Sequence, residues 1–250
     1  MIPTISLLMS PENYEGVIEC AKDNGIDHFE IVCDKYCPEN LKVVSAQSLF
    51  NGITCDNFFT SSENVEKYSG ILTSRIRNYY NYFGCKNFVF GSPKFRNVST
   101  PKENMLALTF FRNVCDNIPK DAILALENNP AEYGTNFGTT FKECLAILSM
   151  IDRKNFKINF DIGGFIKSGD KDIEAVAKNI HQINHIHASR FGLQPISELS
   201  DNEIKYYKEI VSQLKKADDK KTISLEVNIK DGISKELINK EIQIFKEIIQ

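Results

Sequence analysis

Short apolar runs alternate with longer amphipathic segments along the whole chain. Runs of this kind, bounded by turn-forming residues, are typical of strands buried in a parallel sheet. We therefore expect eight strands. They cover Thr4–Met9, Asp27–Val32, Val43–Ser48, Asn87–Gly91, Ala122–Glu127, Lys157–Asp161, Ile183–Ala188 and Thr222–Val227.

The segments between these runs have a helical period. In the segment that begins at Ser62, Val65, Tyr68 and Leu72 recur every three or four residues, which places them on one helix face. Only about ten residues separate the second and third strands, so the helix between them is predicted to be short or missing. Helices are predicted over Pro11–Asn24, Ser62–Phe83, Pro101–Ile118, Thr139–Ile151, Asp170–Ile180, Asp201–Lys216 and Ser234–Ile249.

This order of elements predicts the fold. Strands that alternate with helices along a chain form parallel βα units, and eight such units in 250 residues fit a closed barrel better than an open sheet. No linker-like or low-complexity stretch divides the chain. We therefore predict an α/β protein with a single (β/α)8 TIM barrel over residues 1–250.

Polar residues end four of the later strands on the face that points into the barrel. Because a strand sends alternate side chains to opposite faces, the apolar neighbours of these residues lie under the helices. Active sites of such barrels lie at the carboxyl ends of the strands. The residues predicted to meet there are Glu127, Asp161, His187 and Glu226.

Three carboxylates and one imidazole indicate a metal centre. Three negative charges packed together without a partner would be costly, and a divalent cation removes that cost. Hard oxygen ligands favour Mn²⁺ or Mg²⁺ in this set, with Co²⁺ or Zn²⁺ as the alternatives.

Composition limits the classes of protein and the cellular compartments in which this metal centre is expected. Thirty basic and 33 acidic residues give a net charge of -3, which argues against a nucleic-acid-binding protein. The seven cysteines form no Cys-x-x-Cys pair and are expected to be free thiols. No apolar run approaches the roughly 18 residues that a membrane helix needs, so we expect a cytoplasmic chain without membrane contact. The sequence is also compatible with a homo-oligomer.

Five short motifs resemble the xylose-isomerase-like TIM-barrel superfamily, over nearly the whole chain. Three further stretches, at residues 47–50, 91–96 and 133–137, resemble its sugar phosphate isomerase/epimerase subgroup. The five motifs are Gly-Ile-Asp-His-Phe-Glu-Ile at 25–31, Leu-Ala-Leu-Glu at 124–127, Phe-Asp-Ile-Gly at 160–163, His-Ile-His-Ala-Ser at 185–189 and Ser-Leu-Glu at 224–226.

The resemblance implies a metal-dependent isomerase or epimerase of a sugar or sugar phosphate. Its metal ligands would be the four strand-end residues, and Glu127 and Glu226 would exchange the proton of the substrate carbon through an enediolate. A dehydratase on the same metal platform is the alternative. An endonuclease-IV-like phosphodiesterase fits less well, because such enzymes use about three zinc ions and many His ligands, whereas this chain has four His.

The chain departs from the ketohexose epimerases of that superfamily at three substrate-binding positions. A His, a Glu and an Arg of those enzymes correspond here to Gly164, Arg190 and Leu193, which argues against a free ketohexose. Instead, Lys94, Arg96 and Arg190 are expected to form an anion site for a phosphate or carboxylate. The remaining residues expected to bind substrate are Glu30, Gln47, Asn128 and His185, the last of these one layer below His187.

Overall fold

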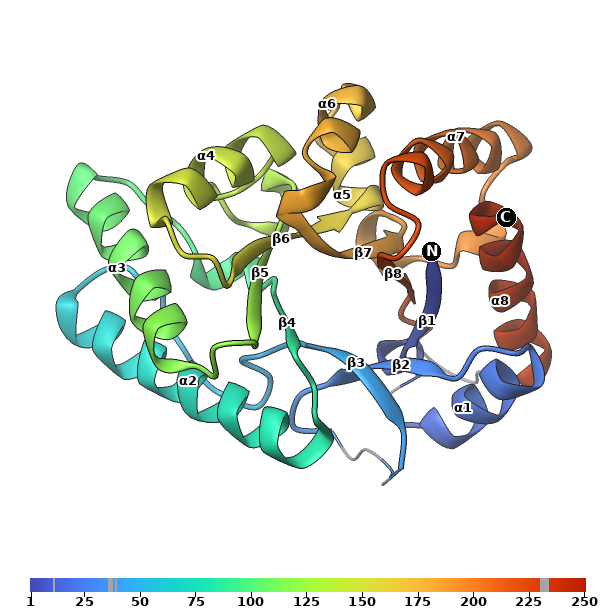
Figure 1. Cartoon of the computed structure of the whole chain (residues 1–250), viewed down its shortest axis with the longest axis horizontal. Helices are drawn as coiled ribbons and strands as arrows, with labels where there is room; N and C mark the ends of the chain where they lie inside the picture. The colour runs from blue at the N-terminus through green and yellow to red at the C-terminus, as the bar shows by residue number, and fades with distance from the viewer. Residues whose placement is uncertain (11, 36–37, 39, 230–233) are drawn as a thin grey trace.

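Backbone hydrogen bonds join β8 to β1 as well as each strand to the next one in the chain, so the sheet closes. The computed structural model describes residues 1–250 except 11, 36–37, 39 and 230–233. All eight pairings are parallel, and helices surround the barrel (Figure 1). The strands are β1 Ile2–Ser6, β2 His28–Val32, β3 Lys42–Gln47, β4 Asn87–Phe90, β5 Ile123–Glu127, β6 Phe156–Asp161, β7 Ile183–Ser189 and β8 Thr222–Glu226.

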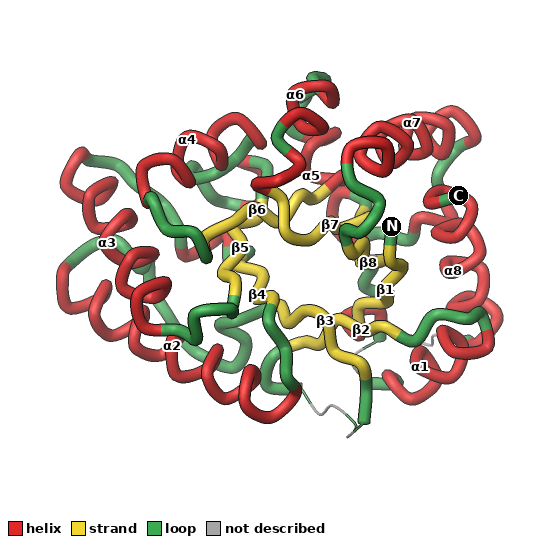
Figure 2. The backbone as a smooth tube through the Cα atoms, viewed as in Figure 1, coloured by secondary structure: helices red, strands yellow, loops and turns green. Residues whose placement is uncertain are grey.

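The predicted (β/α)8 barrel is thereby confirmed, and Figure 2 shows the closed ring of strands inside the helices. Among the described residues between β2 and β3 there is no helix, as the short interval predicted. The helices are α1 Tyr14–Asp23, α2 Ser62–Phe83, α3 Pro101–Asn117, α4 Phe141–Ile151, α5 Ile162–Lys167, α6 Ile173–Lys178, α7 Asp201–Ala217 and α8 Lys235–Ile249.

Two helix predictions need correction. The first helix begins at Tyr14, because the side chain of Asn13 caps its amino end, and the predicted start at Pro11 lies outside the described residues. The predicted helix over Asp170–Ile180 is confined to α6, and the structure adds α5 directly after β6. The side chain of Asp161 accepts a hydrogen bond from the Gly164 backbone, which starts α5 one residue after the strand ends.

Phenylalanine side chains fill much of the layer between the barrel and α2 and α3. Phe58 stacks on Phe110 with ring centroids 5.5 Å apart, and Phe90 lies edge-on to Phe111 at 5.0 Å. All four are fully buried, and such side chains dominate the energetics of a core. The cysteines within the described part of the chain are free thiols, and most of them are buried. None of the helices formed by described residues has both the length and the apolar character needed to cross a membrane.

The registers of the late strands bring the polar ends together. Glu127 lies opposite Asn159, Asp161 opposite His187, and Ser189 opposite Glu226. An irregularity between Ile158 and Asn159 shifts β6 against β7 and sets this alignment. The strand ends therefore point inward at one level, at the carboxyl end of the barrel.

Candidate metal centre

The four predicted ligands meet at the carboxyl end of the barrel. One ligand atom from each of Glu127, Asp161, His187 and Glu226 lies within 4.8 Å of the others. Glu127, Asp161 and Glu226 are the last residues of β5, β6 and β8, and His187 lies in β7. All four side chains are buried. Strand alternation alone predicts that these four side chains meet, since inward-pointing positions of neighbouring strands stack in layers inside a barrel.

His187 is oriented in a way that suits a metal ligand. Its Nε2 atom bonds to Glu30 at 3.0 Å. On the other side of the ring, Nδ1 lies 2.8 Å from Glu127 Oε1 and 3.0 Å from Glu226 Oε2. Nevertheless Nδ1 is buried without a hydrogen-bond partner among the described residues, because neither carboxylate meets it with hydrogen-bond geometry. A nitrogen facing two carboxylate oxygens in this way fits a divalent cation.

Amide groups hold the carboxylate of Glu127 in place. Asn159 donates to its Oε1 atom at 2.9 Å, and Asn129 donates to Oε2 at 2.7 Å. Asn129 is held in turn by Arg96, whose guanidinium donates to the Asn129 side chain and to the backbone oxygen of Glu127. A Cβ atom at Gly91 would lie 2.9 Å from Glu127 Oε2, so a larger residue at position 91 would displace the Glu127 carboxylate.

Asp161 acts both as a candidate ligand and as the cap of α5. One oxygen accepts from the backbone of Gly164 and the other from the Ser189 hydroxyl. The side chain of Asn128 bonds to both the backbone N–H and the backbone oxygen of Asp161, at 2.8 and 3.0 Å. A Cβ at position 164 would lie 2.4 Å from the backbone oxygen of Asn128. The glycine found where ketohexose epimerases carry a His is thus required by this local geometry.

Burial and mutual repulsion separate the proton affinities of these groups. Burial, reinforced by Glu127 and Glu226, raises the pKa of Asp161 to about 8. Burial also raises the pKa of Glu226. Although burial acts in the same direction on Glu127, hydrogen bonds and nearby positive charge lower its pKa. Burial opposes the charged form of His187, but Glu226 and Glu30 raise its pKa well above the ordinary value. Two neighbouring glutamates therefore differ in acidity.

A pocket of about 300 Å³ opens at this end of the barrel, and Glu127, Asp161 and Glu226 of the four predicted ligands line it. Its apolar walls come from Leu8, Val89, Pro93 and Leu193, and its polar groups include hydroxyls and amides. Within the described part of the chain, no Lys or Arg lines it. The polar lining residues are Gln47, Ser48, Ser92, Glu127, Asn129, Tyr133, Asp161, Ser189 and Glu226.

The residues predicted to bind substrate lie at different depths. Gln47 lines the pocket. Glu30 and His185 are fully buried and are absent from the lining. Asn128 is also fully buried, and its side chain is engaged with the backbone of Asp161. In this structure, therefore, only Gln47 of these four faces the space above the ligands.

The structure does not bring Lys94, Arg96 and Arg190 together. Arg96 is fully buried, and the short helical turn that ends at Phe95 directs it behind Glu127. Arg190 is paired with Glu198 at 3.2 Å and lines a separate pocket beside α5 and α7. Lys94 does not line the central pocket. The expected anion site is thus wrong in its geometry, because loop position alone does not tell which way a long side chain turns.

Several residues at the site were not predicted. Asn129 and Ser189 each lie two positions beyond a predicted ligand or strand end, on the same face. Continuing the alternation of side chains past the strand ends would have found both. Tyr133 reaches the pocket from the turn after β5, and its hydroxyl accepts from the Gly192 backbone at 2.7 Å. Residue type and spacing carry no signal for that contact.

Comparisons with known proteins agree with this architecture. A family model described as xylose isomerase-like TIM barrel matches residues 18–248. No curated protein sequence matches the chain.

Solved structures of related fold have low sequence identity. D-allulose 3-epimerase from Methylomonas sp. is 15% identical, with a TM-score of 0.74 over 99% of this chain and 98% of that one. The probable 3-DHS dehydratase AsbF from Bacillus anthracis is also 15% identical, with a TM-score of 0.67 over 98% and 99%. The IOLI protein, solved with a zinc atom, is 16% identical, with a TM-score of 0.72 over 100% and 98%.

The raised pKa of Asp161 predicts how stability depends on pH without metal. The folded chain holds that proton up to about pH 8, whereas an unfolded Asp releases it near pH 3.9. The stabilisation is present below pH 3.9 and is lost as the pH rises to about 8. In EDTA, the free energy of unfolding should therefore fall between pH 5 and 8, by up to about 1.4 kcal/mol per pH unit from this group.

Urea denaturation at each pH tests this dependence. Asp161→Asn keeps an acceptor for the Gly164 backbone and removes the titrating group, so its profile should be flatter. The exposed Asp219→Asn should keep the wild-type profile. An Asp161→Asn profile as steep as the wild type would contradict the assignment.

Two identical substitutions should have opposite effects on stability. At Gly164 the new methyl group meets backbone, so Gly164→Ala should destabilise the chain by about 1–3 kcal/mol. At Gly70, exposed within α2, a Cβ meets nothing within 4 Å, so Gly70→Ala should stabilise by up to about 1 kcal/mol. Urea midpoints measure both. Equal stability of Gly164→Ala and the wild type would show that α5 can start elsewhere.

Proposed function

The chain belongs to the xylose isomerase-like TIM-barrel family, and we propose that it is a divalent-metal-dependent isomerase or epimerase of a small sugar. The observation that carries the proposal is the unpartnered Nδ1 atom of His187, which faces two carboxylates on the floor of the pocket. A zinc atom in the structure of the IOLI protein and the epimerase activity named for the D-allulose enzyme support it.

Glu127, Asp161, His187 and Glu226 would hold the cation. Their oxygen-rich composition favours Mn²⁺ or Mg²⁺, and Co²⁺ or Zn²⁺ are the other candidates. When bound, such a cation polarises a substrate carbonyl and makes the neighbouring carbon acidic. A site held by three carboxylates and one imidazole carries enough negative charge to attract a divalent ion.

The two glutamates take different parts in proton transfer. Glu127 is the proton acceptor, because two amides stabilise its carboxylate form. Glu226 is the proton donor, since burial raises its pKa. Return of the proton to the same carbon inverts that carbon, and return to its neighbour isomerises the sugar.

The lining of the pocket indicates an uncharged substrate. Hydroxyl and amide groups of Gln47, Ser48, Ser92, Asn129 and Ser189 suit sugar hydroxyls. A phosphate or carboxylate would find no Lys or Arg on the described lining. We therefore propose a neutral sugar in place of the sugar phosphate that the subgroup resemblance implied.

A dehydratase is the second candidate. Its first step is the same proton removal beside a carbonyl, and Glu226 as an acid can protonate a leaving hydroxyl on the next carbon. The dehydratase named among the similar structures supports this alternative. The dehydratase releases water from the substrate, so its product is lighter by one water molecule, whereas an isomerase leaves the mass unchanged. A phosphodiesterase acting on DNA is disfavoured, because the described pocket lining carries no cation to bind a phosphate backbone.

The proposed proton exchange predicts the effect of removing either carboxylate. Glu127→Gln and Glu226→Gln should each slow deuterium incorporation from D₂O into the reactive sugar by at least about 100-fold. Proton NMR over a panel of ketoses and aldoses, with Mn²⁺ or Mg²⁺ added, identifies the substrate and measures the rate. Glu209→Gln, on the exposed side of α7, is the matched control and should keep the wild-type rate. Normal exchange in either variant would remove that residue from the mechanism.

The absence of Lys and Arg from the described pocket lining predicts selectivity between a sugar and its phosphate ester. The neutral sugar should have a kcat/KM at least about tenfold higher, because desolvating an unmatched phosphate is costly. Arg190→Gln should leave that ratio unchanged, since Arg190 is paired with Glu198 outside the pocket. A preference for the phosphate ester would contradict the proposed substrate class.

A further inference from the structure

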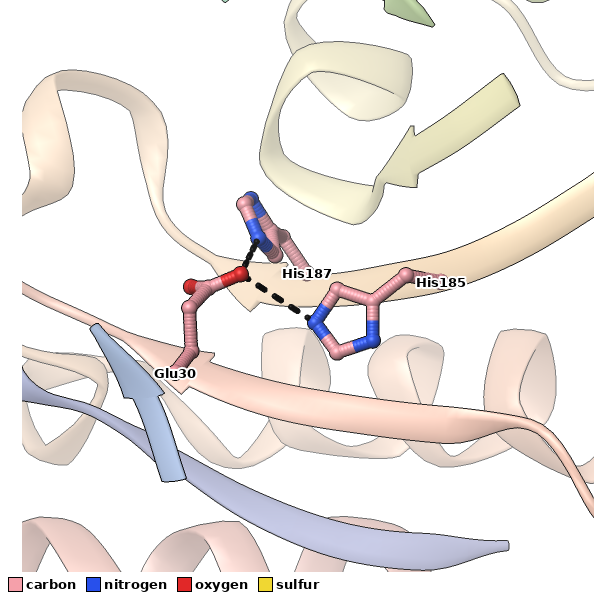
Figure 3. Close-up of side chains that lie close together, drawn as sticks. All are labelled: Glu30, His185 and His187. Carbon is pink, nitrogen blue, oxygen red and sulfur yellow. Dashed lines mark hydrogen bonds and ion pairs between the residues drawn. The ribbon is translucent and has the colours of Figure 1, made fainter. Parts of the chain in front are cut away.

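Beneath the candidate metal centre, Glu30 touches two imidazoles inside the barrel. Its Oε2 atom lies 3.0 Å from His187 Nε2 and 3.3 Å from His185 Nε2. Figure 3 marks both contacts with dashed lines. All three side chains are fully buried, and Glu30 does not line the pocket. This carboxylate therefore cannot be reached by a substrate in the pocket and acts, if at all, through its neighbours.

A second set of contacts holds Glu30 in place. Its other oxygen, Oε1, accepts from Gln47 Nε2 at 2.7 Å, and the same amide nitrogen lies 2.9 Å from Ser6 Oγ. No Lys or Arg is among the partners that the described residues provide for this carboxylate. A buried carboxylate paired only with amide and imidazole groups is costly to keep, so its contact with His187 needs an explanation beyond packing.

The contact determines which nitrogen of His187 is free. His187 would bind a cation as a neutral imidazole, which carries one N–H, and the hydrogen bond to Glu30 then places this N–H on Nε2. The lone pair is then on Nδ1, which faces Glu127 and Glu226. The ring is thus fixed in both tautomer and direction by a group in β2, which is three strands away from β7 around the barrel.

A second cation between Glu30 and the two imidazoles does not fit. His187 would need a lone pair on Nε2 as well as on Nδ1, and a neutral ring has only one. His185 is already engaged on both nitrogens, through Nε2 with Ser224 at 2.9 Å and through Nδ1 with Thr222. The group formed by Glu30, His185 and His187 is therefore a hydrogen-bonded support.

We propose that Glu30 is a positioning residue that presents His187 Nδ1 to a divalent cation. This inference rests on the proposed function. It gives Glu30 a role in orienting His187, in place of the substrate contact expected from the sequence. Carboxylates that accept from a metal-bound His orient the ring and increase its basicity, and their loss typically weakens metal binding 10- to 100-fold.

Isothermal titration of the purified chain with Zn²⁺ or Mn²⁺ tests the proposal. Glu30→Gln keeps an acceptor for Nε2 but loses the charge, and Gln47 can turn its amide to accommodate it. We expect its metal affinity to fall about tenfold. Glu30→Ala removes the acceptor, and we expect a loss of about 100-fold. Thr4→Val, in β1, changes another fully buried side chain of the barrel interior and should bind metal as the wild type does.

A spectroscopic signature separates positioning from a general effect on folding. In the Zn²⁺-loaded wild type, the Nε2 proton of His187 should give a downfield NMR signal protected from exchange. Glu30→Gln should keep the signal, and Glu30→Ala should lose it. If Glu30→Ala does not fold, the metal affinity of Glu30→Gln alone tests the positioning role.

The outcomes are distinguishable. Metal affinities of folded Glu30 variants within threefold of the wild type would overturn the positioning role and leave the proposed function standing. A wild-type chain that binds neither ion would overturn both.

Discussion

The arrangement of the barrel interior depends on one electrostatic constraint, which is the burial of several carboxylates around a single imidazole. Glu127, Asp161 and Glu226 share the upper layer with His187, and Glu30 lies below it. Charges of one sign at such distances cannot all persist without compensation. His187 lies between the two layers and contacts three of the four carboxylates. A divalent ion bound on the upper side, as proposed, would supply the positive charge that one imidazole cannot.

Neutral groups then determine where each oxygen points. Amides from Asn128, Asn129 and Asn159 bond to the strand ends that carry the ligands. Glycines at positions 91 and 164 leave space that a methyl group would take from Glu127 and Asp161. Amides can satisfy a carboxylate without cancelling its charge, so the site stays attractive to a cation while its geometry is fixed.

Strand alternation predicted the fold and the meeting of Glu127, Asp161, His187 and Glu226 at one end of the barrel, because a period of two depends only on the backbone. It could not predict the depth or direction of side chains that follow the strands. Arg96 follows a turn whose Ser92 has a φ of 44°, and the chain then directs the guanidinium inward instead of into the pocket. Glu30 and Asn128 lie near the site, but their residue types alone do not tell whether they contact a substrate or a neighbouring group of the protein.

The two glutamates show how identical residues at equivalent strand ends acquire different chemistry. Glu127 accepts from two amides and lies beside the Arg96 guanidinium, whose charge persists because burial lowers its pKa only to about 10. Glu226 has His187 as its polar neighbour and is otherwise governed by burial, which raises its pKa. Proton transfer across a carbon needs one group that accepts and one that donates. Asn129, Asn159 and Arg96 contact Glu127 and not Glu226, so in the proposed reaction residues outside the predicted ligand set would decide which glutamate accepts the proton.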